Sequence, residues 1–408
     1  MTTAPRLAWL DALRGYAAAV VALFHLSPVV LGSERHLAVY RQFDLGKYGV
    51  LLFFLVSGYV IPMSLERHGS LRRFWIGRIF RIYPAYLFTI GIAVALAAAG
   101  LYRLPPQWAA ETATTVLGHA TMMQDLLGVR GIVRPFWTLS FEMLFYLLVA
   151  ALFAVGWHRA SAWWAAGLTL VAVLGGSRLP PDLLGATEAD RLWSAVVVSL
   201  LISVCFVAYG KNALFGLGVL VLALANGHAT SWVTSASSAQ ALLILAVMFA
   251  GTVICRAQHG QIGRRAATVT LLLVATGLAV HQWQASGTGL LRWTLLTAAV
   301  AGTFALAWAL RRRRVPGVLT WLGTVSYSLY LLHLLVLGAV VRLTGDPVIT
   351  VLAFAAGTLS VAWLAHRWVE RPGQAIGRRI GERFGVAEIA TQGGTPRTGS
   401  FGKQRESV

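Results

Sequence analysis

Apolar runs about as long as a bilayer is thick recur along almost the whole 408-residue chain. Hydrophobic residues make up 57% of it and charged residues only 12%, which is too little charge for the surface of a soluble protein of this size. The pattern predicts an all-α, polytopic membrane bundle of about 10–12 transmembrane helices. We expect spans at about 8–31, 46–66, 83–101, 137–156, 162–178, 192–209, 212–226, 239–256, 266–283, 291–310, 318–341 and 348–369.

The net charge of +19 is unevenly distributed along the chain. With the N-terminus placed inside the cell, nearly all of the basic excess falls on the inner side, including the clusters Arg72–Arg73, Arg264–Arg265 and Arg311 to Arg314. This is the positive-inside distribution of membrane proteins, and it explains the charge without a nucleic-acid partner. Arginine and alanine are abundant, as in GC-rich bacterial genomes. The expected location is therefore a bacterial inner membrane, crossed many times, with both termini in the cytoplasm.

The chain divides into a membrane domain, expected over residues 1–384, and a polar tail over 385–408, expected to be disordered in the cytoplasm. No internal repeat is visible, so an inverted-repeat transporter has no support in the sequence. The connection 102–136 is long, is expected on the outer side, and has room for a re-entrant or interfacial helix. Cys205 and Cys255 both lie in apolar runs, which excludes a disulfide framework and a zinc ribbon. No metal site is expected.

The first predicted span carries three ionisable residues, Asp11, Arg14 and His25, although such residues are costly inside a membrane and mark functional sites. On a helix, Arg14 and His25 lie about 20° apart, and Asp11 lies about 60° from Arg14. All three therefore share one stripe. Arg14 and His25 are roughly 16 Å apart along the axis, so one end of the stripe is cytoplasmic and the other lies in the outer third of the membrane.

Carboxylates are expected at the depth of His25. Asp44 precedes the second span at its outer end, and Glu142 lies one turn into the outer end of the fourth. An imidazole beside a carboxylate can act as a general base, because the acid orients the ring and stabilises the imidazolium that forms. The structural alternative is that Asp11 and Arg14 pair at the interface while His25 bonds to a neighbouring helix.

A basic cluster within residues 72–84 is expected on the cytoplasmic side, before the third span. Arg78 and Arg81 are three residues apart, so they project from one face of a helix. Arginine forks match phosphate groups, which makes this pair a candidate phosphate clamp. The alternative is a positive-inside anchor beside lipid headgroups.

Six motifs, taken in order, resemble the acyltransferase-3 family of integral-membrane bacterial O-acyltransferases, and they bracket about 365 residues. Each is weak alone, but the ordered set is specific. The motifs are LDALRG at 10–15 with His25, FFLVSGYVIP at 53–62, RIFRIYPAY at 78–86, WTLSFEMLFYLL at 137–148, SYSLYLLH at 326–333 and VERP at 369–372.

The resemblance implies about ten membrane helices and transfer of an acyl group, with acetyl the commonest in the family, from cytoplasmic acyl-CoA to a hydroxyl of a carbohydrate or glycosylated metabolite. It implies that His25 is the catalytic base. It also implies that Arg78 and Arg81 hold the CoA phosphates, with Arg14 matching the family's first-span arginine. Glu142 matches the glutamate of the family's Trp-x-Leu-Ser-x-Glu motif.

The chain departs from the family pattern at Leu51 and Met143, where many members carry acids. Asp44 and Glu142 are therefore the expected partners of His25. A C-terminal hydrolase-like domain, which many members carry, is not expected, so the chain resembles the stand-alone members.

The distance between the two ends of the stripe matches the length of a pantetheine arm, which would bring the thioester from the arginines to His25. Direct transfer and an acyl-histidine intermediate are both open. Tight helix packing is the alternative for the segment around Ser57, and a packing hydrogen bond is the alternative for His333. The residues expected to bind substrate are Ser57, Tyr59, Trp137 and His333.

Two residues near the end of the last span, His366 and Glu370, are one turn apart and are expected to be structural. Two other functional classes compete with the enzyme: a transporter or flippase for a glycolipid or acyl-sugar, and an inert membrane scaffold. Neither needs a histidine and carboxylates at one depth with an arginine pair at the opposite surface. The sequence leaves the acceptor and the oligomeric state open.

Overall fold

The computed structural model describes residues 7–175, 192–194, 196–197, 237–287 and 289–391, and every regular element within these ranges is helical. Most are α-helices, joined by two short 3-10 helices (η1, η2) and a π-helical turn (η3). In chain order they are α1 (Ala8–Leu31), α2 (Ser33–Gln42), α3 (Leu45–His68), α4 (Leu71–Ala98), α5 (Gln107–Ala110), α6 (Thr112–Thr121), η1 (Arg134–Phe136), α7 (Trp137–Ala154), η2 (Trp157–Arg159), α8 (Ser161–Gly175), α11 (Ser238–Gln258), α12 (Arg264–Ser286), α13 (Leu290–Ala309), α14 (Gly317–Leu343), α15 (Pro347–Ala365), η3 (His366–Glu370) and α16 (Arg371–Thr391).

Nine helical segments of the described chain are long and apolar enough to cross a membrane, and α8 is a shorter apolar helix. The prediction of an all-α polytopic bundle is therefore confirmed. The shorter helix corresponds to the predicted span 162–178, as far as that span is described. The predicted spans 192–209 and 212–226 lie almost entirely outside the described residues.

The helix of the third predicted span begins well before residue 83, where the sequence analysis placed the start of the span. Helix α4 runs without a break from Leu71 to Ala98 and includes Pro84. Ser70 caps its first turn by accepting a hydrogen bond from the backbone N–H of Arg73. Arg78 therefore lies on the same unbroken helix as the apolar run that follows it, and its side chain is buried.

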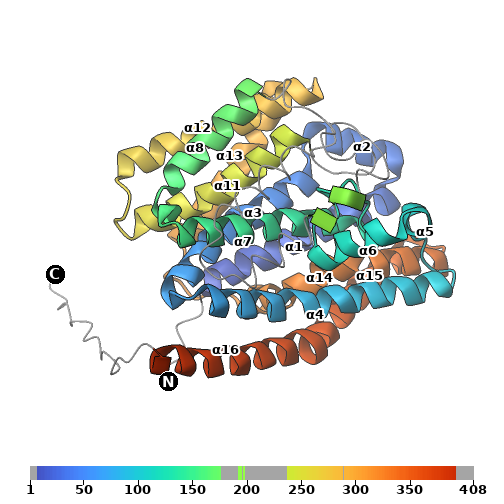
Figure 1. The fold of residues 1–408 in the computed structure, drawn as a ribbon. Helices are drawn as coiled ribbons and strands as arrows, with labels where there is room; N and C mark the ends of the chain where they lie inside the picture. The colour runs from blue at the N-terminus through green and yellow to red at the C-terminus, as the bar shows by residue number, and fades with distance from the viewer. Residues whose placement is uncertain (1–6, 176–191, 195, 198–236, 288, 392–408) are drawn as a thin grey trace.

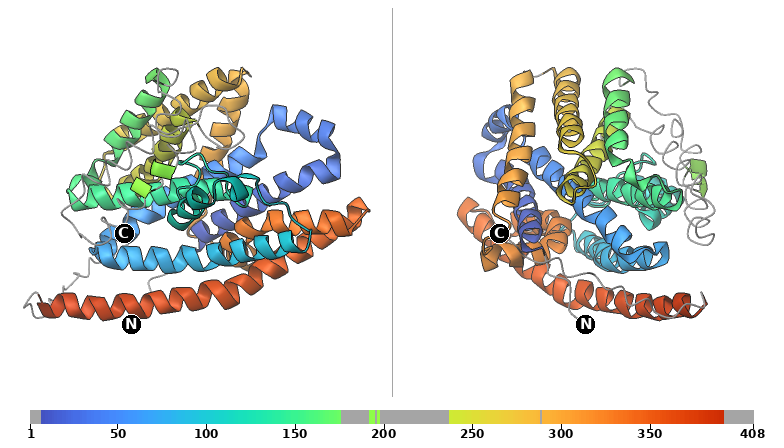
Figure 2. Two further views of the ribbon diagram at one scale, coloured as in Figure 1. Left: turned by 45° about the vertical axis from the view of Figure 1, so that its right-hand side comes forward. Right: turned by 90° about the vertical axis from the view of Figure 1, so that its left-hand side faces the viewer.

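Helix α1 lies between α3 and α14 in the middle of the bundle. Figures 1 and 2 show α8, α11, α12 and α13 grouped on one side of it and α4, α14, α15 and α16 on the other. The last helix, α16, packs along the outside of α4. The N-terminal helix, which carries the ionisable stripe, is therefore surrounded by protein over much of its length.

Glycines allow the central helices to approach closely. A Cβ at Gly323 on α14 would overlap the backbone carbonyl of Asp11 on α1, and Gly15 on α1 lies against the backbone of Gly323. A Cβ at Gly58 on α3 would overlap the carbonyl of Met248 on α11. Small residues at such crossings bring backbones into van der Waals contact, which is a main source of helix association in membranes. Tight helix packing, the alternative that the sequence analysis gave for the segment around Ser57, is confirmed.

The long connection 102–136, in which the sequence analysis left room for a re-entrant or interfacial helix, holds two short helices, α5 and α6, and the 3-10 turn η1. Residues 122–129, which follow α6, are all buried. At the other end of the chain, α16 extends to Thr391, beyond the predicted boundary at residue 384, and residues 392–408 of the predicted tail lie outside the described part.

The turn η3 fixes the end of α15 against α14. Glu370 is buried and accepts hydrogen bonds from the backbone N–H of Ser328, 3.1 Å away, and from the Ser328 hydroxyl. Its second oxygen lies 3.1 Å from Nδ1 of His366. The structural role expected for His366 and Glu370 fits these contacts.

Replacing Gly323 by alanine is expected to separate α1 from α14, because the new methyl group would overlap the backbone of Asp11. Overpacking of this kind costs about 1–3 kcal/mol, and a backbone partner cannot move aside as a side chain can. The measurement is the thermal unfolding midpoint in detergent, with Gly302→Ala on α13 as the control. Open space surrounds Gly302, so its variant should be neutral or slightly stabilising. An unchanged midpoint for Gly323→Ala would contradict the close crossing.

Candidate active site

His25 lies in the last two turns of α1 with its ring between two partners. Its Nδ1 is 2.9 Å from the carbonyl oxygen of Val21, one turn earlier, and 3.1 Å from Nε2 of His333 on α14. The two rings are tilted by 44° with their centroids 5.1 Å apart. His333 is fully buried, and its Nδ1 is 2.8 Å from the carbonyl oxygen of Tyr330. The two helices thus bring together two histidines that are 308 positions apart.

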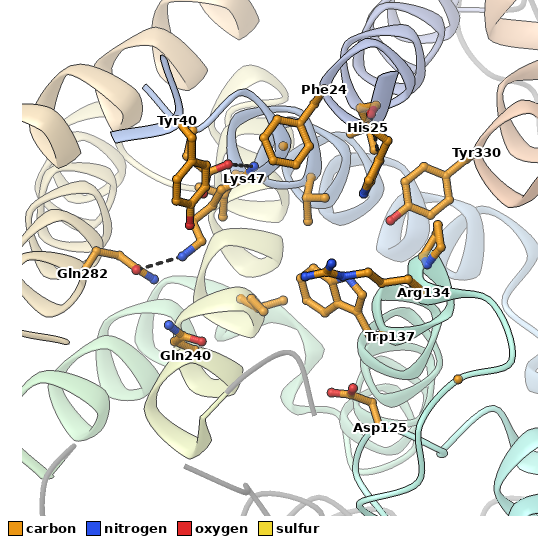
Figure 3. A pocket seen from close by; sticks show the side chains of 18 of the residues that line it. Phe24, His25, Tyr40, Lys47, Asp125, Arg134, Trp137, Gln240, Gln282 and Tyr330 are labelled. Atoms are coloured by element: carbon orange, nitrogen blue, oxygen red, sulfur yellow. Dashed lines mark hydrogen bonds between the residues drawn. The ribbon is translucent and has the colours of Figure 1, made fainter. Parts of the chain in front are cut away.

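His25 faces a cavity of about 700 Å³. The walls come from the ends of α1 and α3, from α2, from the connection before α7, and from α11, α12 and α14 (Figure 3). Trp137 and Tyr330 supply aromatic surface, and Arg134 reaches into the cavity from the same wall as Trp137. A space of this size, with a few polar groups among apolar ones, is typical of small-molecule sites.

Asp44 lines this cavity, but its carboxylate caps α3. Its Oδ1 accepts a hydrogen bond of 2.8 Å from the backbone N–H of Lys47. The Lys47 ammonium donates to Oε1 of Gln282 at 3.0 Å and lies 4.9 Å from the ring centre of Trp293. On the neighbouring α2, burial raises the pKa of Tyr40, so the phenol that lines the cavity stays protonated.

An arginine cluster surrounds Glu142 nearer the start of α1. Arg14 is buried, and its charged neighbours include Arg81 and Glu142. The Tyr146 hydroxyl donates to Glu142, one helical turn away, and the guanidinium of Arg78 lies 5.2 Å from the Tyr146 ring centre. The structure therefore brings together the three arginines that the sequence singled out, from α1 and α4, around a carboxylate of α7.

Glu142 is not the partner of His25 that the sequence analysis expected. It bonds to Tyr146 and lies among the arginines, whereas His333 and the Val21 carbonyl occupy Nδ1 of His25. The reason is depth: Trp137 borders the cavity, and five residues further along α7 place Glu142 about 7.5 Å deeper. Asp44 is at the right depth, but it makes no hydrogen bond to His25 in the described part of the chain.

Ser57 and Tyr59 lie away from the cavity. Ser57 is buried in the α3 crossing, and the Tyr59 hydroxyl donates to Oε1 of Gln258 at 2.5 Å. The Tyr59 ring packs edge-on against Trp9, at the start of α1. Of the residues expected to bind substrate, Trp137 lines the cavity and His333 supports it from behind His25. Sequence reasoning missed Arg134, Lys47 and Tyr330, of which only Tyr330 fell within a recognised motif.

His119 on α6 fastens the connection that forms one wall of the cavity. Its Nδ1 is 2.9 Å from the carbonyl oxygen of Thr115, which therefore accepts the ring N–H. Its Nε2 accepts a hydrogen bond of 3.1 Å from the backbone N–H of Ile132. Gly131 and Arg134, on either side of this anchor point, line the cavity. Only a neutral imidazole can make both bonds, and burial lowers the pKa of His119 to about 4.

These features define a polytopic helical membrane protein with a histidine-bearing cavity and an arginine cluster on the same central helix. The family model described as an acyltransferase domain matches residues 7–367, so the chain belongs to the acyltransferase-3 family. The resemblance noted in the sequence is thereby confirmed, and the protein is a member of a family of membrane acyltransferases.

Three curated relatives share part of the chain. It is 29% identical over 181 residues to Acyltransferase MdmB of Streptomyces mycarofaciens, which covers 41% of this chain and 45% of that protein. It is 31% identical over 119 residues to the exopolysaccharide production protein ExoZ of Rhizobium meliloti (strain 1021), covering 27% and 35%. It is 30% identical over 139 residues to nodulation protein 10 of Rhizobium leguminosarum bv. viciae, covering 31% and 37%. The chain thus spans less than half the length of each. No solved structure matches.

Acidification is expected to break the hydrogen bond between His119 and Ile132 and so to destabilise the cavity wall that this bond holds. The folded-state pKa is lowered from 6.5 to about 4, so the unfolded or opened segment binds more protons between these values. The stabilisation is complete above about pH 6.5 and is lost as the pH falls toward 4. Hydrogen exchange of residues 122–133, corrected for the intrinsic rate, should lose up to about tenfold protection per pH unit in this window. His119→Gln keeps an acceptor that does not titrate. If hydrogen exchange in this variant depends on pH as strongly as in the wild type, protonation of His119 does not control the cavity wall.

Proposed function

We propose that the protein is a membrane O-acyltransferase that moves an acyl group, acetyl in the first instance, from cytoplasmic acyl-CoA to a hydroxyl of a carbohydrate or glycosylated metabolite. The observation that carries this proposal is the arrangement along α1. His25 faces the cavity, and Arg14 lies within the arginine cluster roughly 16 Å away along the axis. The orientation proposed from the charge distribution, with both termini in the cytoplasm of a bacterial inner membrane, places the arginines on the side where acyl-CoA is made.

The arginine cluster suits the phosphates of the donor. Arg14, Arg78 and Arg81 carry three positive charges, and the carboxylates of Glu142 and Asp11, which both act on Arg14, offset only part of them. Nε of Arg14 is buried without a hydrogen-bond partner, which leaves a donor available for a ligand oxygen. Guanidinium groups bind phosphate through paired N–H donors, and such charge-assisted bonds are the strong ones. The pantetheine arm would then extend along α1 toward His25.

The cavity suits a hydroxylated acceptor. His25 would take the proton of the acceptor hydroxyl on Nε2 while the oxygen attacks the thioester carbonyl carbon. The carbon–sulfur bond then breaks, and the CoA thiolate leaves and takes the proton back from His25. Trp137 offers an aromatic face to a sugar ring, beside the hydrogen-bonding groups of Arg134 and Gln240. The name of the relative ExoZ refers to exopolysaccharide production, which favours a carbohydrate acceptor.

His25→Ala is expected to abolish acyl transfer, because removal of a general base lowers the rate by about 10²–10⁴-fold. The measurement is release of free CoA from labelled acetyl-CoA by protein in liposomes, with a mixture of polysaccharide and glycoside acceptors. His259→Ala is the control, since this histidine is exposed at the end of α11 and contacts Cys255. Equal rates for wild type and His25→Ala would remove His25 from the mechanism. Movement of glycolipid across the bilayer without CoA release would favour a transporter.

Arg81→Ala is expected to weaken acyl-CoA binding and to leave the acceptor's KM unchanged. One charge-assisted hydrogen bond contributes about 1.5–3 kcal/mol, which corresponds to about a ten- to hundredfold rise in the Kd of CoA. Direct binding of CoA to the purified protein tests this without any acceptor. Arg312→Ala removes the same charge from the exposed α13–α14 connection and should bind CoA normally. An equal loss of CoA affinity in both variants would show that CoA binds to basic surface without specific contacts to the arginine cluster.

A further inference from the structure

We propose that His333 is a positioning residue that sets the tautomer of His25, and that this neutral imidazole takes the place of the carboxylate usually found beside a catalytic histidine. The inference rests on the proposed role of His25 as the general base. In this proposal His333 positions His25 and does not bind substrate, because His333 is fully buried and does not line the cavity.

The proton positions follow from the acceptors around each ring. Nδ1 of His333 faces the carbonyl oxygens of Tyr330, at 2.8 Å, and Leu329, at 3.3 Å. A carbonyl only accepts, so this nitrogen carries the proton, and Nε2 of the neutral ring is left with a lone pair. That lone pair faces Nδ1 of His25 at 3.1 Å. Two lone pairs cannot bond to each other, so Nδ1 of His25 must carry a proton, which the Val21 carbonyl at 2.9 Å also requires.

The lone pair of His25 is therefore on Nε2, the nitrogen that bonds to neither Val21 nor His333. Since His25 lines the cavity and its Nδ1 is bonded within the protein, Nε2 is the nitrogen available to an acceptor hydroxyl. When Nε2 takes the proton, the ring becomes positively charged and its Nδ1–H becomes a stronger donor to Val21 and His333. The pair thus orients the base at rest and stabilises its protonated form during the reaction, which are the two tasks of the acid in a catalytic triad.

The charged and titratable groups around the pair leave this task to His333. Among the described residues, Arg134 of η1 and His36 of α2 act electrostatically on His25, and the phenol of Tyr330 lines the same cavity. None of these groups is an anion that could balance an imidazolium. The carboxylates that border the cavity are Asp44, which caps α3, and Asp125, whose connection lies on the opposite wall. Within the described residues, neither carboxylate hydrogen bonds to His25 or His333.

The backbone holds the two rings in register. His25 lies ten residues after Gly15, and His333 lies ten residues after Gly323, so the parallel helices α1 and α14 cross at the glycines and meet again at the histidines. Equal spacing along two parallel helices places both rings at the same depth, about 15 Å from the crossing.

Glutamine and methionine at position 333 separate this role from packing, because they have nearly the same shape and only glutamine offers a strong acceptor to Nδ1 of His25. We expect His333→Gln to keep kcat within about a factor of ten of wild type and His333→Met to lose about 10²-fold, the lower range for a general base. The KM for the acceptor should change little in either variant, since His333 does not border the cavity. Equal losses in the two variants, or losses confined to KM, would overturn the proposal.

A second measurement needs no substrate and remains informative if the proposed acyltransfer fails. Diethyl pyrocarbonate modifies neutral imidazole nitrogens, and mass spectrometry gives the modification rate of each histidine. His25 should react in wild type and in His333→Gln, and several-fold more slowly in His333→Met, because an acceptor on Nδ1 raises the basicity of Nε2. Modification of His333 before His25, or a rate for His25 in His333→Met equal to wild type, would exclude the pair. If the wild type releases no CoA but the histidines show the expected modification rates, the proposed reaction is refuted and the histidine pair is not.

Discussion

Without side chains at Gly15 and Gly323, α1 and α14 approach to backbone contact, and the position of His25 relative to His333 depends on that approach. Helix association in a bilayer gains little from the hydrophobic effect, because lipid tails are as apolar as leucine. Close packing at the glycines supplies the contact instead, and the parallel helices then meet again at His25 and His333. The same device joins α3 to α11 at Gly58, which fixes a second wall of the cavity.

Helix α1 carries ionisable groups at two depths, and the free-energy cost of burying them is offset in a different way at each depth. Near the start of the helix, the charge of Arg14 is offset in part by Glu142 and Asp11, while Arg78 and Arg81 leave the cluster with an excess of positive charge. Near its end, His25 is paired with a neutral ring and carries no permanent charge into the bundle. A single helix therefore sets the distance between the arginine cluster and the histidine that faces the cavity, and the proposed transfer from a phosphate-bearing thioester donor needs such a separation.

The helical spans and the stripe on α1 were predictable, because span length and the 100° step of a helix depend only on local sequence. The start of α4 was only partly predictable: the spacing of Arg78 and Arg81 indicated a helix, but a hydropathy pattern does not show that this helix continues into the apolar run, as it does from Leu71 to Ala98. Glu142 was assigned to the wrong partner for a related reason. Sequence gives approximate depth, but the neighbours of a side chain depend on how α7 is rotated and on how far it is shifted relative to α1.

The proposed pairing of two histidines bears on a departure from the family pattern. Many members of the family carry an acid at the position of Leu51 on α3. In this chain, Leu51 is a buried apolar residue in the cavity wall. A carboxylate at that depth would have to be desolvated and balanced by a cation or protonated, and either would cost free energy. In the proposed pair, the lone pair of His333 accepts the Nδ1–H of His25 without a resting charge, so the proposed base can be oriented in an apolar wall. The arrangement gives up part of the electrostatic stabilisation of the imidazolium and in return avoids a buried anion beside an apolar surface.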